Sequence, residues 1–467
     1  MRIIILCTLL CMLTPFYMSA QGLFESALET TGNRESDAYD LQGGLTSVVY
    51  TGYNTEEDQP YLQSIYSQLN LGIGIPAGGF GKAFADTRFR YGQEFGSRIT
   101  SAELREAYVN LFLGPVTLTA GKQILSWGAA GFINPSDRFS PVDPVFRSPD
   151  PDEQRLGTWA LNTTLSISNT SRLEFLWLPD YRPSVLLTGP FDMPAYLEIL
   201  PFSTTHQKFT DSGFGFRYDL RSGALDLQLS YYNGFRNSPV LSTETFDVDT
   251  STFAPKLISL GQHPVRVHSA GLNMTVPAGS YLIRTEIGWL DAIEDSLDAA
   301  PFTELGYTLE IEQSGSNVSL IAGYYGKFIF DFEPTPLETA FFSGQFPPVS
   351  DLLPPGTPPE PAILANYVES QVIGFNRLYE YQREEWMHAV YAIADISLFH
   401  DLVSFKIPGM YNFTTGEVTL MPEVKFMITD GLSAGIGAYY LKGKEGSLYD
   451  MVAPSLNAGF LQVQLQF

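Results

Sequence analysis

The feature of this chain that most constrains its fold is an alternation of polar and apolar side chains, which recurs in many segments of about 10 to 13 residues. In residues 64–75, for example, Ile65 and Leu69 fall on one face, while Gln68 and Asn70 fall on the other. Successive side chains of a β-strand point to opposite faces. Each such segment therefore predicts a strand with one apolar and one polar face.

The alternation recurs about eighteen times along the chain, and sixteen strands is the alternative count. The predicted strands are residues 41–53, 64–76, 80–91, 99–113, 115–124, 154–168, 171–178, 211–220, 224–233, 265–277, 280–290, 303–313, 317–327, 384–399, 402–411, 416–428, 431–441 and 454–467. This pattern predicts an all-β protein.

The connections between these strands are expected to alternate strictly between tight turns and long loops. Gly114 and residues 169–170 are tight turns, whereas residues 125–153, 179–210 and 234–264 are long. This parity is typical of a transmembrane antiparallel barrel with short periplasmic turns and long extracellular loops. Soluble propellers and sandwiches are the alternative, but their strands are shorter and their loops do not sort by parity.

The N-terminus predicts export. Arg2 precedes an apolar run over residues 3–13, and small residues follow up to Ala20, so residues 1–20 are interpreted as a signal peptide. Cys7 and Cys11 both lie within it, which predicts a mature protein without thiols or disulfides. We expect residues 21–40 to form a periplasmic segment and residues 41–467 to form the barrel. Beyond the signal peptide there is no run of about 18 apolar residues.

The charge of the chain excludes one class of function. Its 27 basic and 51 acidic residues give a net charge of -24, and a nucleic-acid-binding protein needs a basic surface. Most of the excess acidic residues fall on predicted long loops and on the N-terminal segment. We therefore expect an acidic outer rim that meets divalent cations and lipopolysaccharide, and a wall close to neutral.

The C-terminus carries a first resemblance. Leu461, Val463, Leu465 and the terminal Phe467 alternate with glutamines. This pattern resembles the signature by which the barrel assembly machinery recognises bacterial outer-membrane barrels. The resemblance implies a protein of the Gram-negative outer membrane, surrounded by lipid and lipopolysaccharide.

A second resemblance lies in residues 104–143, which read LREAYVNLFLGPVTLTAGKQILSWGAAGFINPSDRFSPVD. A strand with Glu-Ala-Tyr, a tight turn, a strand ending in Gly-Lys-Gln, and then Trp-Gly and Asn-Pro-x-Asp are similar to a broad group of porin-like barrels. These are distantly similar to alginate-export porins and are mostly of unknown function. The resemblance implies the fold and a channel-like role, without naming a solute.

If the apolar faces meet lipid, the polar faces line a lumen. Cations and carboxylates on separate strands could set up a transverse field that orients a polar solute. The alternative is that opposite charges pair within the wall, as Arg284 and Glu286 could. The predicted pore-lining residues are Lys82, Asp86, Arg88, Arg90, Glu106, Arg217, Asp226, Arg284, Glu286, Glu310, Glu312, Glu423 and Lys425.

Two long loops are candidates for closing the pore. Residues 125–153 are rich in turn-forming residues, and we expect them to fold inward or to lie exposed on the surface. The candidate residues for a constriction are Trp127, Asn134, Asp137, Arg138 and Arg147.

Residues 328–383 contain nine prolines and many apolar residues. They could cap the barrel, bind a partner or hold a lipophilic solute, or their aromatic side chains could pack on one another. The apolar residues are Phe328, Phe330, Phe332, Phe341, Phe342, Phe346, Leu352 and Leu353.

The sequence offers no pattern of an enzyme. The chain has five histidines, none in a His-x-Ser arrangement, and His400-Asp401 falls in a predicted periplasmic turn. We expect no catalytic residue, cofactor or metal. The predicted function is an outer-membrane channel or substrate-selective porin for small polar or amphipathic solutes. The alternative is a plugged barrel that serves as an adhesin or as a partner in a secretion or surface-polysaccharide assembly. The sequence indicates no solute and no oligomeric state.

Overall fold

A computed structural model describes residues 39–54, 59–128, 130–187, 194–202, 209–249, 254–293, 299–338 and 361–467. The predicted signal peptide and almost all of the predicted periplasmic segment 21–40 lie outside the described residues.

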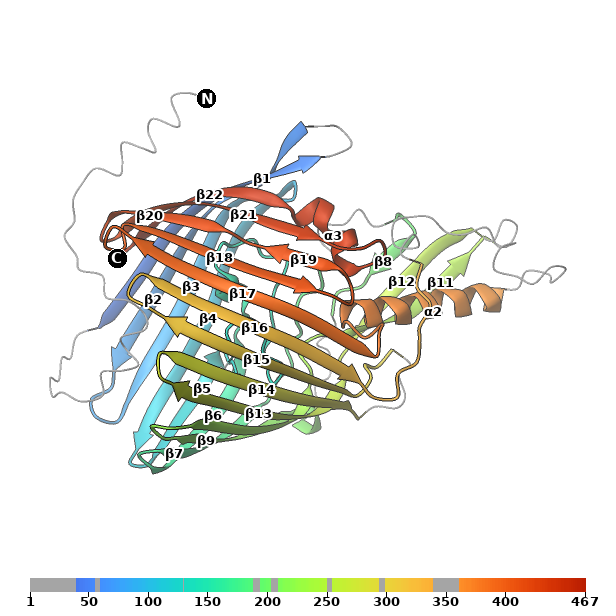
Figure 1. Cartoon of the computed structure of the whole chain (residues 1–467). Coiled ribbons are helices and arrows are strands. Elements are labelled where there is room, and N and C mark those ends of the chain that lie inside the picture. The colour runs from blue at the N-terminus through green and yellow to red at the C-terminus, as the bar shows by residue number, and fades with distance from the viewer. Residues whose placement is uncertain are drawn as a thin grey trace.

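The strands close into a single antiparallel barrel of eighteen strands, in which each strand pairs with its neighbours in the chain and β1 pairs with β22 (Figure 1). This confirms the predicted fold class and the count of eighteen. The strands are β1 (Asp40–Asn54), β2 (Gln59–Pro76), β3 (Gly81–Glu94), β4 (Ser97–Leu113), β5 (Val116–Gln123), β6 (Thr158–Ser168), β7 (Ser171–Leu178), β9 (Gly213–Arg221), β10 (Asp226–Phe235), β13 (Arg266–Ala278), β14 (Tyr281–Ala292), β15 (Glu304–Ser314), β16 (Val318–Ile329), β17 (Trp386–Leu398), β18 (Val403–Asn412), β19 (Glu417–Leu420) with β20 (Glu423–Thr429), β21 (Leu432–Lys442) and β22 (Ala458–Gln466).

One barrel strand is interrupted. The segments β19 and β20 both pair with β18 on one side and β21 on the other, so together they form one strand of the barrel. Met421 and Pro422 separate them, and a proline has no N–H for a strand ladder. The predicted continuous strand 416–428 is therefore in the right place but broken.

The predicted parity of the connections is correct for the sides of the barrel but not strict in length. The β3–β4 connection is only Phe95 and Gly96, both with positive φ, and the β18–β19 connection is residues 413–416. Both lie at the long-loop end. The predicted loop 54–63 is also largely strand, because β1 extends to Asn54 and β2 begins at Gln59.

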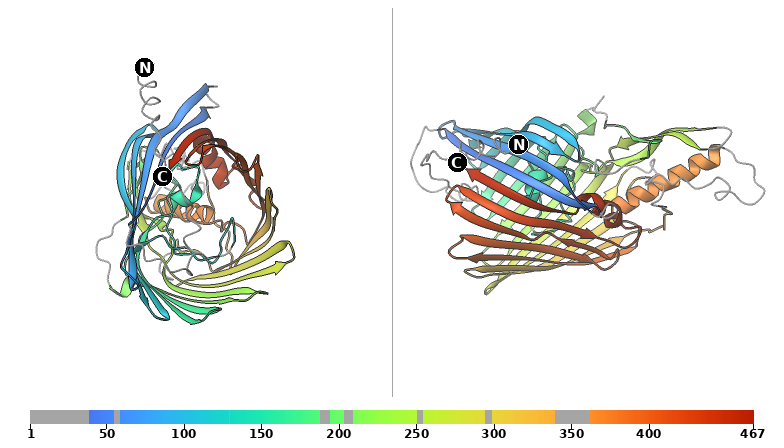
Figure 2. Two further views of the ribbon diagram at one scale, coloured as in Figure 1. Left: turned by 90° about the vertical axis from the view of Figure 1, so that its left-hand side faces the viewer. Right: turned by 90° about the horizontal axis from the view of Figure 1, so that it is seen from above.

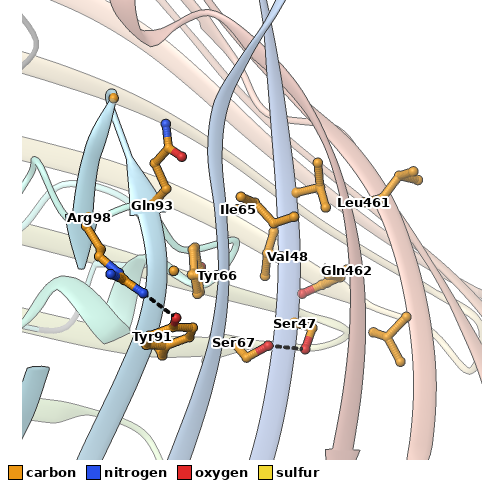
Figure 3. A pocket seen from close by; sticks show the side chains of 14 residues that line it. Ser47, Val48, Ile65, Tyr66, Ser67, Tyr91, Gln93, Arg98, Leu461 and Gln462 are labelled. Atoms are coloured by element: carbon orange, nitrogen blue, oxygen red, sulfur yellow. Dashed lines mark hydrogen bonds between the residues drawn. The ribbon is translucent and has the colours of Figure 1, made fainter. Parts of the chain in front are cut away.

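The outer surface of the barrel is apolar, as a wall in lipid requires. Ile65, Tyr91 and Leu461 are 43%, 58% and 59% exposed. A shallow groove on this surface holds a polar pair, in which the Ser47 and Ser67 hydroxyls lie 2.8 Å apart (Figure 3). In the part of the chain that the structure describes, no helix is both long and apolar enough to cross a bilayer.

The long-loop end carries a small subdomain. The strands β8 (Leu197–Ile199), β11 (Val240–Val248) and β12 (Pro255–His263) form a three-stranded sheet, and the helix α2 (Pro361–Tyr379) packs on it through Val368 and Val372. Figure 1 shows α2, β11 and β12 beyond the end of the barrel. The predicted structureless segment 328–383 therefore contains a helix. The shorter helices are η2 (Pro151–Gln154), η3 (Phe209–Asp211) and α3 (Leu448–Leu456).

Candidate functional site: a constriction inside the barrel

The loop of residues 124–157, called the constriction loop here, lies inside the barrel. The end-on view shows it, coloured teal, within the ring of strands (Figure 2). The backbone N–H of Gly131 donates to the Glu310 carboxylate of β15, and the Arg88 guanidinium of β3 donates to the Glu153 carbonyl oxygen. The strands β3 and β15 lie half the ring apart. The loop is therefore attached to opposite walls and crosses the lumen.

A row of glycines receives the loop at one wall. Gly271, Gly288 and Gly306 lie side by side in register on β13, β14 and β15. A Cβ at Gly271 would lie 2.7 Å from the Cβ of Ser136, and a Cβ at Gly306 would lie 2.9 Å from the Cβ of Pro135. A Cβ at Gly288 would overlap the carbonyl oxygen of Pro135. Only glycines allow the loop backbone to approach this closely.

Glu286 fixes the same part of the loop. Its carboxylate accepts hydrogen bonds from the Ser136 backbone N–H at 2.9 Å, the Ser136 hydroxyl at 2.7 Å and the Ala130 N–H at 3.2 Å. Glu286 is 1% exposed and Glu310 is 0% exposed. Hydrogen bonds from N–H groups to a buried carboxylate are among the stronger ones in proteins. The two glutamates predicted to line the pore are thus used to hold the loop.

The indole of Trp127 lies against the wall near the start of the loop. Its Nε1 donates to Glu174 of β7 at 3.3 Å, and its ring packs edge-on against Phe139 with a centroid distance of 4.8 Å. The guanidinium of Arg217 lies 5.5 Å from the Trp127 ring. Phe139 in turn packs against Tyr232 of β10. This predicted constriction residue therefore anchors the loop and is 2% exposed.

The middle of the loop holds the other predicted constriction residues. The Asn134 carbonyl oxygen accepts the Asp137 N–H at 3.2 Å, which forms a tight turn. Burial raises the pKa of Asp137, opposed by Arg155 at 3.6 Å. Arg138 extends to the wall and ion-pairs with Glu304 of β15 at 2.7 Å. All three side chains are thus involved in contacts that shape the loop.

Arg147 anchors the loop at the opposite wall. Its guanidinium lies 4.9 Å from the Tyr50 ring and 5.3 Å from the Tyr439 ring, and it donates to the Gln63 side chain and to the Leu456 carbonyl oxygen at 2.9 Å. These partners belong to β1, β21, β2 and α3. Arg147 is 7% exposed, and burial lowers its pKa. A buried cation with aromatic rings and acceptors around it fixes the loop to these elements.

The carboxylate of Glu153 adds further contacts at this wall. It accepts from Gln68 at 2.7 Å and from Asn70 at 3.1 Å, both on β2. Ser148 of the loop donates to its other oxygen at 2.6 Å. Arg90 donates to the Arg147 carbonyl oxygen at 2.7 Å. Residues of three strands therefore hold the second end of the loop.

Opposite charges inside the barrel pair across strands. Arg88 binds Glu103 of β4 at 3.1 Å, and Arg217 binds Glu174 at 2.5 Å. The same strand alternation puts Asp226 on the face of β10 that holds Tyr232. The remaining predicted residues Lys82, Asp86, Glu423 and Lys425 share the faces of Arg88 and of the bonded Gln462 and Gln464.

Arg284 has different partners from those expected. The sequence suggested Glu286, two residues along the same strand, but Arg284 ion-pairs with Glu312 on β15 and lies 3.8 Å from Glu310. Neighbouring strands bring these side chains together directly, whereas Glu286 is turned to the loop. The expected pairing was wrong for this residue.

Two polar residues of β4 were missed. Arg105 binds Asp86 at 3.1 Å and Glu103 binds Arg88, although both fall outside the predicted pore-lining set. A register shift between Asp86 and Thr87 leaves an extra residue on β4, so inward-facing positions no longer follow simple alternation. Glu106, beyond this bulge, accepts the Ile124 N–H at 2.9 Å.

The aromatic residues of segment 328–383 are partly described. Phe328 packs against Phe330 and Trp386, with centroid distances of 4.9 and 4.5 Å, and Phe332 packs against Phe302. These aromatic side chains pack on one another. Phe341, Phe342, Phe346, Leu352 and Leu353 lie outside the described residues.

Comparison with known proteins gives one family and a set of similar folds. The model of the family described as "Protein of unknown function (DUF1302)" matches residues 53–445. No curated protein matches the chain. OccAB3 of Acinetobacter baumannii is similar with a TM-score of 0.53 at 11% identity, over 92% of this chain and 99% of that one.

Two structures from Pseudomonas aeruginosa are similar to the same extent. The outer membrane protein OpdK has a TM-score of 0.53 at 8% identity, over 92% of this chain and 98% of that one. OpdO has a TM-score of 0.51 at 10% identity, over 92% and 96%. At such low identity the similarity establishes a shared fold.

Proposed function

Because this chain belongs to the family of proteins of unknown function (DUF1302), whose description gives no activity, we propose its function from the site itself. The protein is a channel of the bacterial outer membrane for passive diffusion of small polar or amphipathic solutes, narrowed by the constriction loop. The observation that carries this proposal is the attachment of the loop to opposite walls, through Glu310 and Arg88.

A loop held in this way sets the width of the pore. Its contacts with the wall are hydrogen bonds to buried carboxylates at one end and a buried arginine at the other. A buried hydrogen bond to a charged group contributes about 1.5–3 kcal/mol. Several of them keep the loop in place during passage of a solute, so the loop selects by size and polarity.

The rest of the barrel supports the same function. Its outer surface is apolar, which suits lipid, and its inner surface carries paired charges and amides, which suit water. An eighteen-stranded barrel is wide enough for an aqueous lumen. The fold shared with OpdK, whose title calls it an outer membrane protein, supports the proposed location.

Liposome swelling tests the proposal. Purified protein in liposomes should admit small sugars and amino acids, and the rate should fall as the solute grows, because the constriction loop limits the opening. Liposomes without protein are the control. Folded protein that admits no solute of any size would contradict the channel function.

The subdomain beyond the barrel favours a second candidate. The helix α2 and the sheet of β8, β11 and β12 present a folded surface at the long-loop end. A plugged barrel that displays this surface as an adhesin, or to a partner in secretion or polysaccharide assembly, would have the same parts. It differs in the swelling test, because a plugged barrel admits no solute.

A further inference from the structure

Six charged side chains meet where the constriction loop, two other loops and the barrel wall come together. We call them the mouth cluster, and they comprise Arg138, Arg236, Lys327, Arg377, Glu304 and Glu380. Arg138 belongs to the constriction loop, Arg236 follows β10, and Arg377 lies in the last turn of α2. Glu304 and Lys327 lie on β15 and β16, and Glu380 follows α2.

Direct contacts join the members of the cluster. Glu304 accepts from Lys327 at 2.8 Å through one oxygen and pairs with Arg138 at 2.7 Å through the other. Arg236 ion-pairs with Glu380, and Lys327 also donates to the Glu380 carbonyl oxygen at 2.9 Å. The cluster is therefore one network.

A glutamine joins Arg377 to this network. The Gln382 carbonyl oxygen accepts from Arg377 at 3.2 Å, and its amide nitrogen donates to Glu304 at 2.8 Å. The Arg377 guanidinium lies 3.7 Å from the centre of the Phe302 ring. Burial lowers the pKa of Arg377 to about 10, with Arg236 lowering it further and Glu380 opposing both. The guanidinium groups of Arg236 and Arg377 are thus close enough to repel each other.

The charges of the cluster do not balance. It contains four cations and two carboxylates, which leaves an excess of two positive charges in a chain whose net charge is -24. Arg236, Lys327 and Arg377 are 4%, 5% and 5% exposed. Buried charges are costly unless they are paired and hydrogen-bonded, so an excess of this kind calls for an anion.

Arg236 supplies a second, independent observation. Its Nε and Nη1 are buried, and neither has a hydrogen-bond partner among the residues that the structure describes. Arginine presents its N–H groups as a planar fork that matches the two oxygens of a carboxylate or phosphate. Two such donors are therefore buried beside an uncompensated positive charge.

We propose that the mouth cluster binds a doubly charged oxyanion group, with Arg236 and Arg377 as its main contacts. Two negative charges balance the excess of two positive charges, and the open N–H groups of Arg236 receive the oxygens. The shared chemistry is that of a phosphate group or a pair of carboxylates. Because Arg138 belongs to the constriction loop, the site lies at that loop's edge, and only the description of the anion as a passing solute rests on the proposed function.

Equilibrium dialysis of the folded full-length protein in detergent with radiolabelled inorganic phosphate tests the proposal without requiring a channel. Wild-type protein should bind about one phosphate per chain. Arg236→Gln should weaken this binding about tenfold or more, because a charge-assisted hydrogen bond of about 1.5–3 kcal/mol is lost and each 1.4 kcal/mol is a factor of about ten.

Two further variants separate binding from a general loss of structure. Glu380→Gln removes a carboxylate, so the positive excess rises and phosphate binding should become several-fold tighter. Arg172→Gln is the matched control, because Arg172 pairs with Asp219 elsewhere in the barrel and should leave binding unchanged. Unboiled samples on a denaturing gel check that each variant remains a folded barrel.

Competition identifies the anion. Displacement of phosphate by succinate, but not by equal acetate or chloride, supports a site for two negative charges; resistance to succinate supports a phosphate-specific site. Equal displacement by acetate or chloride overturns the proposal. So does an absence of phosphate binding to wild-type protein, or an equal loss in Arg172→Gln and Arg236→Gln. A protein that binds phosphate but shows no solute uptake would retain this site and lose the channel function.

Discussion

At the scale of single residues, the closest approach of loop and wall is at Gly288. Any side chain at this position meets the Pro135 carbonyl. We predict that Gly288→Ala lifts residues 130–140 away from the wall, since overlap of this kind costs about 1–3 kcal/mol. Hydrogen exchange at the Ser136 amide, which is bonded to Glu286, should rise about tenfold or more.

Gly44 offers a matched control. It also lies on the inner face of the barrel, in β1, but a Cβ there would lie 3.6 Å from the Leu465 carbonyl oxygen, which is an ordinary contact. Gly44→Ala should leave the exchange of the Ser136 amide unchanged. Equal exchange in wild type and Gly288→Ala would show that the glycine row does not hold the loop.

The sequence contains the signals for this contact only in part. The Asn-Pro-x-Asp motif and the inward position of Glu286 could be predicted from residues alone. That Gly271, Gly288 and Gly306 form one row depends on strand register, and predicted strand ends vary by two to four residues. A shift of that size separates the glycines.

At the scale of elements, a single asparagine joins α2 to the sheet beyond the barrel. The Asn376 side chain accepts the Leu241 N–H at 2.9 Å and donates to the Leu241 carbonyl oxygen at 2.7 Å. Asn376→Ala leaves two buried backbone groups without partners, at about 1–3 kcal/mol each. We predict faster proteolysis within residues 361–379 while the barrel keeps its heat-dependent gel mobility.

Ser370→Ala controls for a change elsewhere on the same helix. Its hydroxyl donates to the Tyr367 carbonyl oxygen within α2, so its loss should leave the proteolysis rate near that of wild type. If Asn376→Ala is cut no faster than Ser370→Ala, the asparagine does not hold the helix in place.

The strands could be predicted and this helix was not, for one physical reason. The polar and apolar faces of the barrel strands meet water and lipid, so their alternation is visible in the sequence. In α2 the buried residues Leu364, Val368, Val372 and Phe375 do recur at helical spacing. The prolines that precede them obscured this signal, and the segment was interpreted as a loop.

At the scale of the whole molecule, the closed wall separates two environments. The chain ends complete it, because the Gly43 and Phe467 backbones exchange hydrogen bonds of 2.8 and 2.9 Å. This contact fits the terminal strand expected from the sequence, while the role of Phe467 in assembly stays a prediction. The mouth cluster could not be predicted, since its residues run from 138 to 380 and meet only in the folded barrel.

Single-channel conductance of the protein in planar bilayers tests the central claim most directly. We compare wild type with a variant in which residues 130–150 are replaced by a short glycine-serine linker, which removes both the Ser136 and the Arg147 anchors. Wild type should show stable openings, and the variant should show openings of clearly larger conductance. Equal conductance in the two folded proteins, or no conductance in either, would contradict a channel narrowed by this loop.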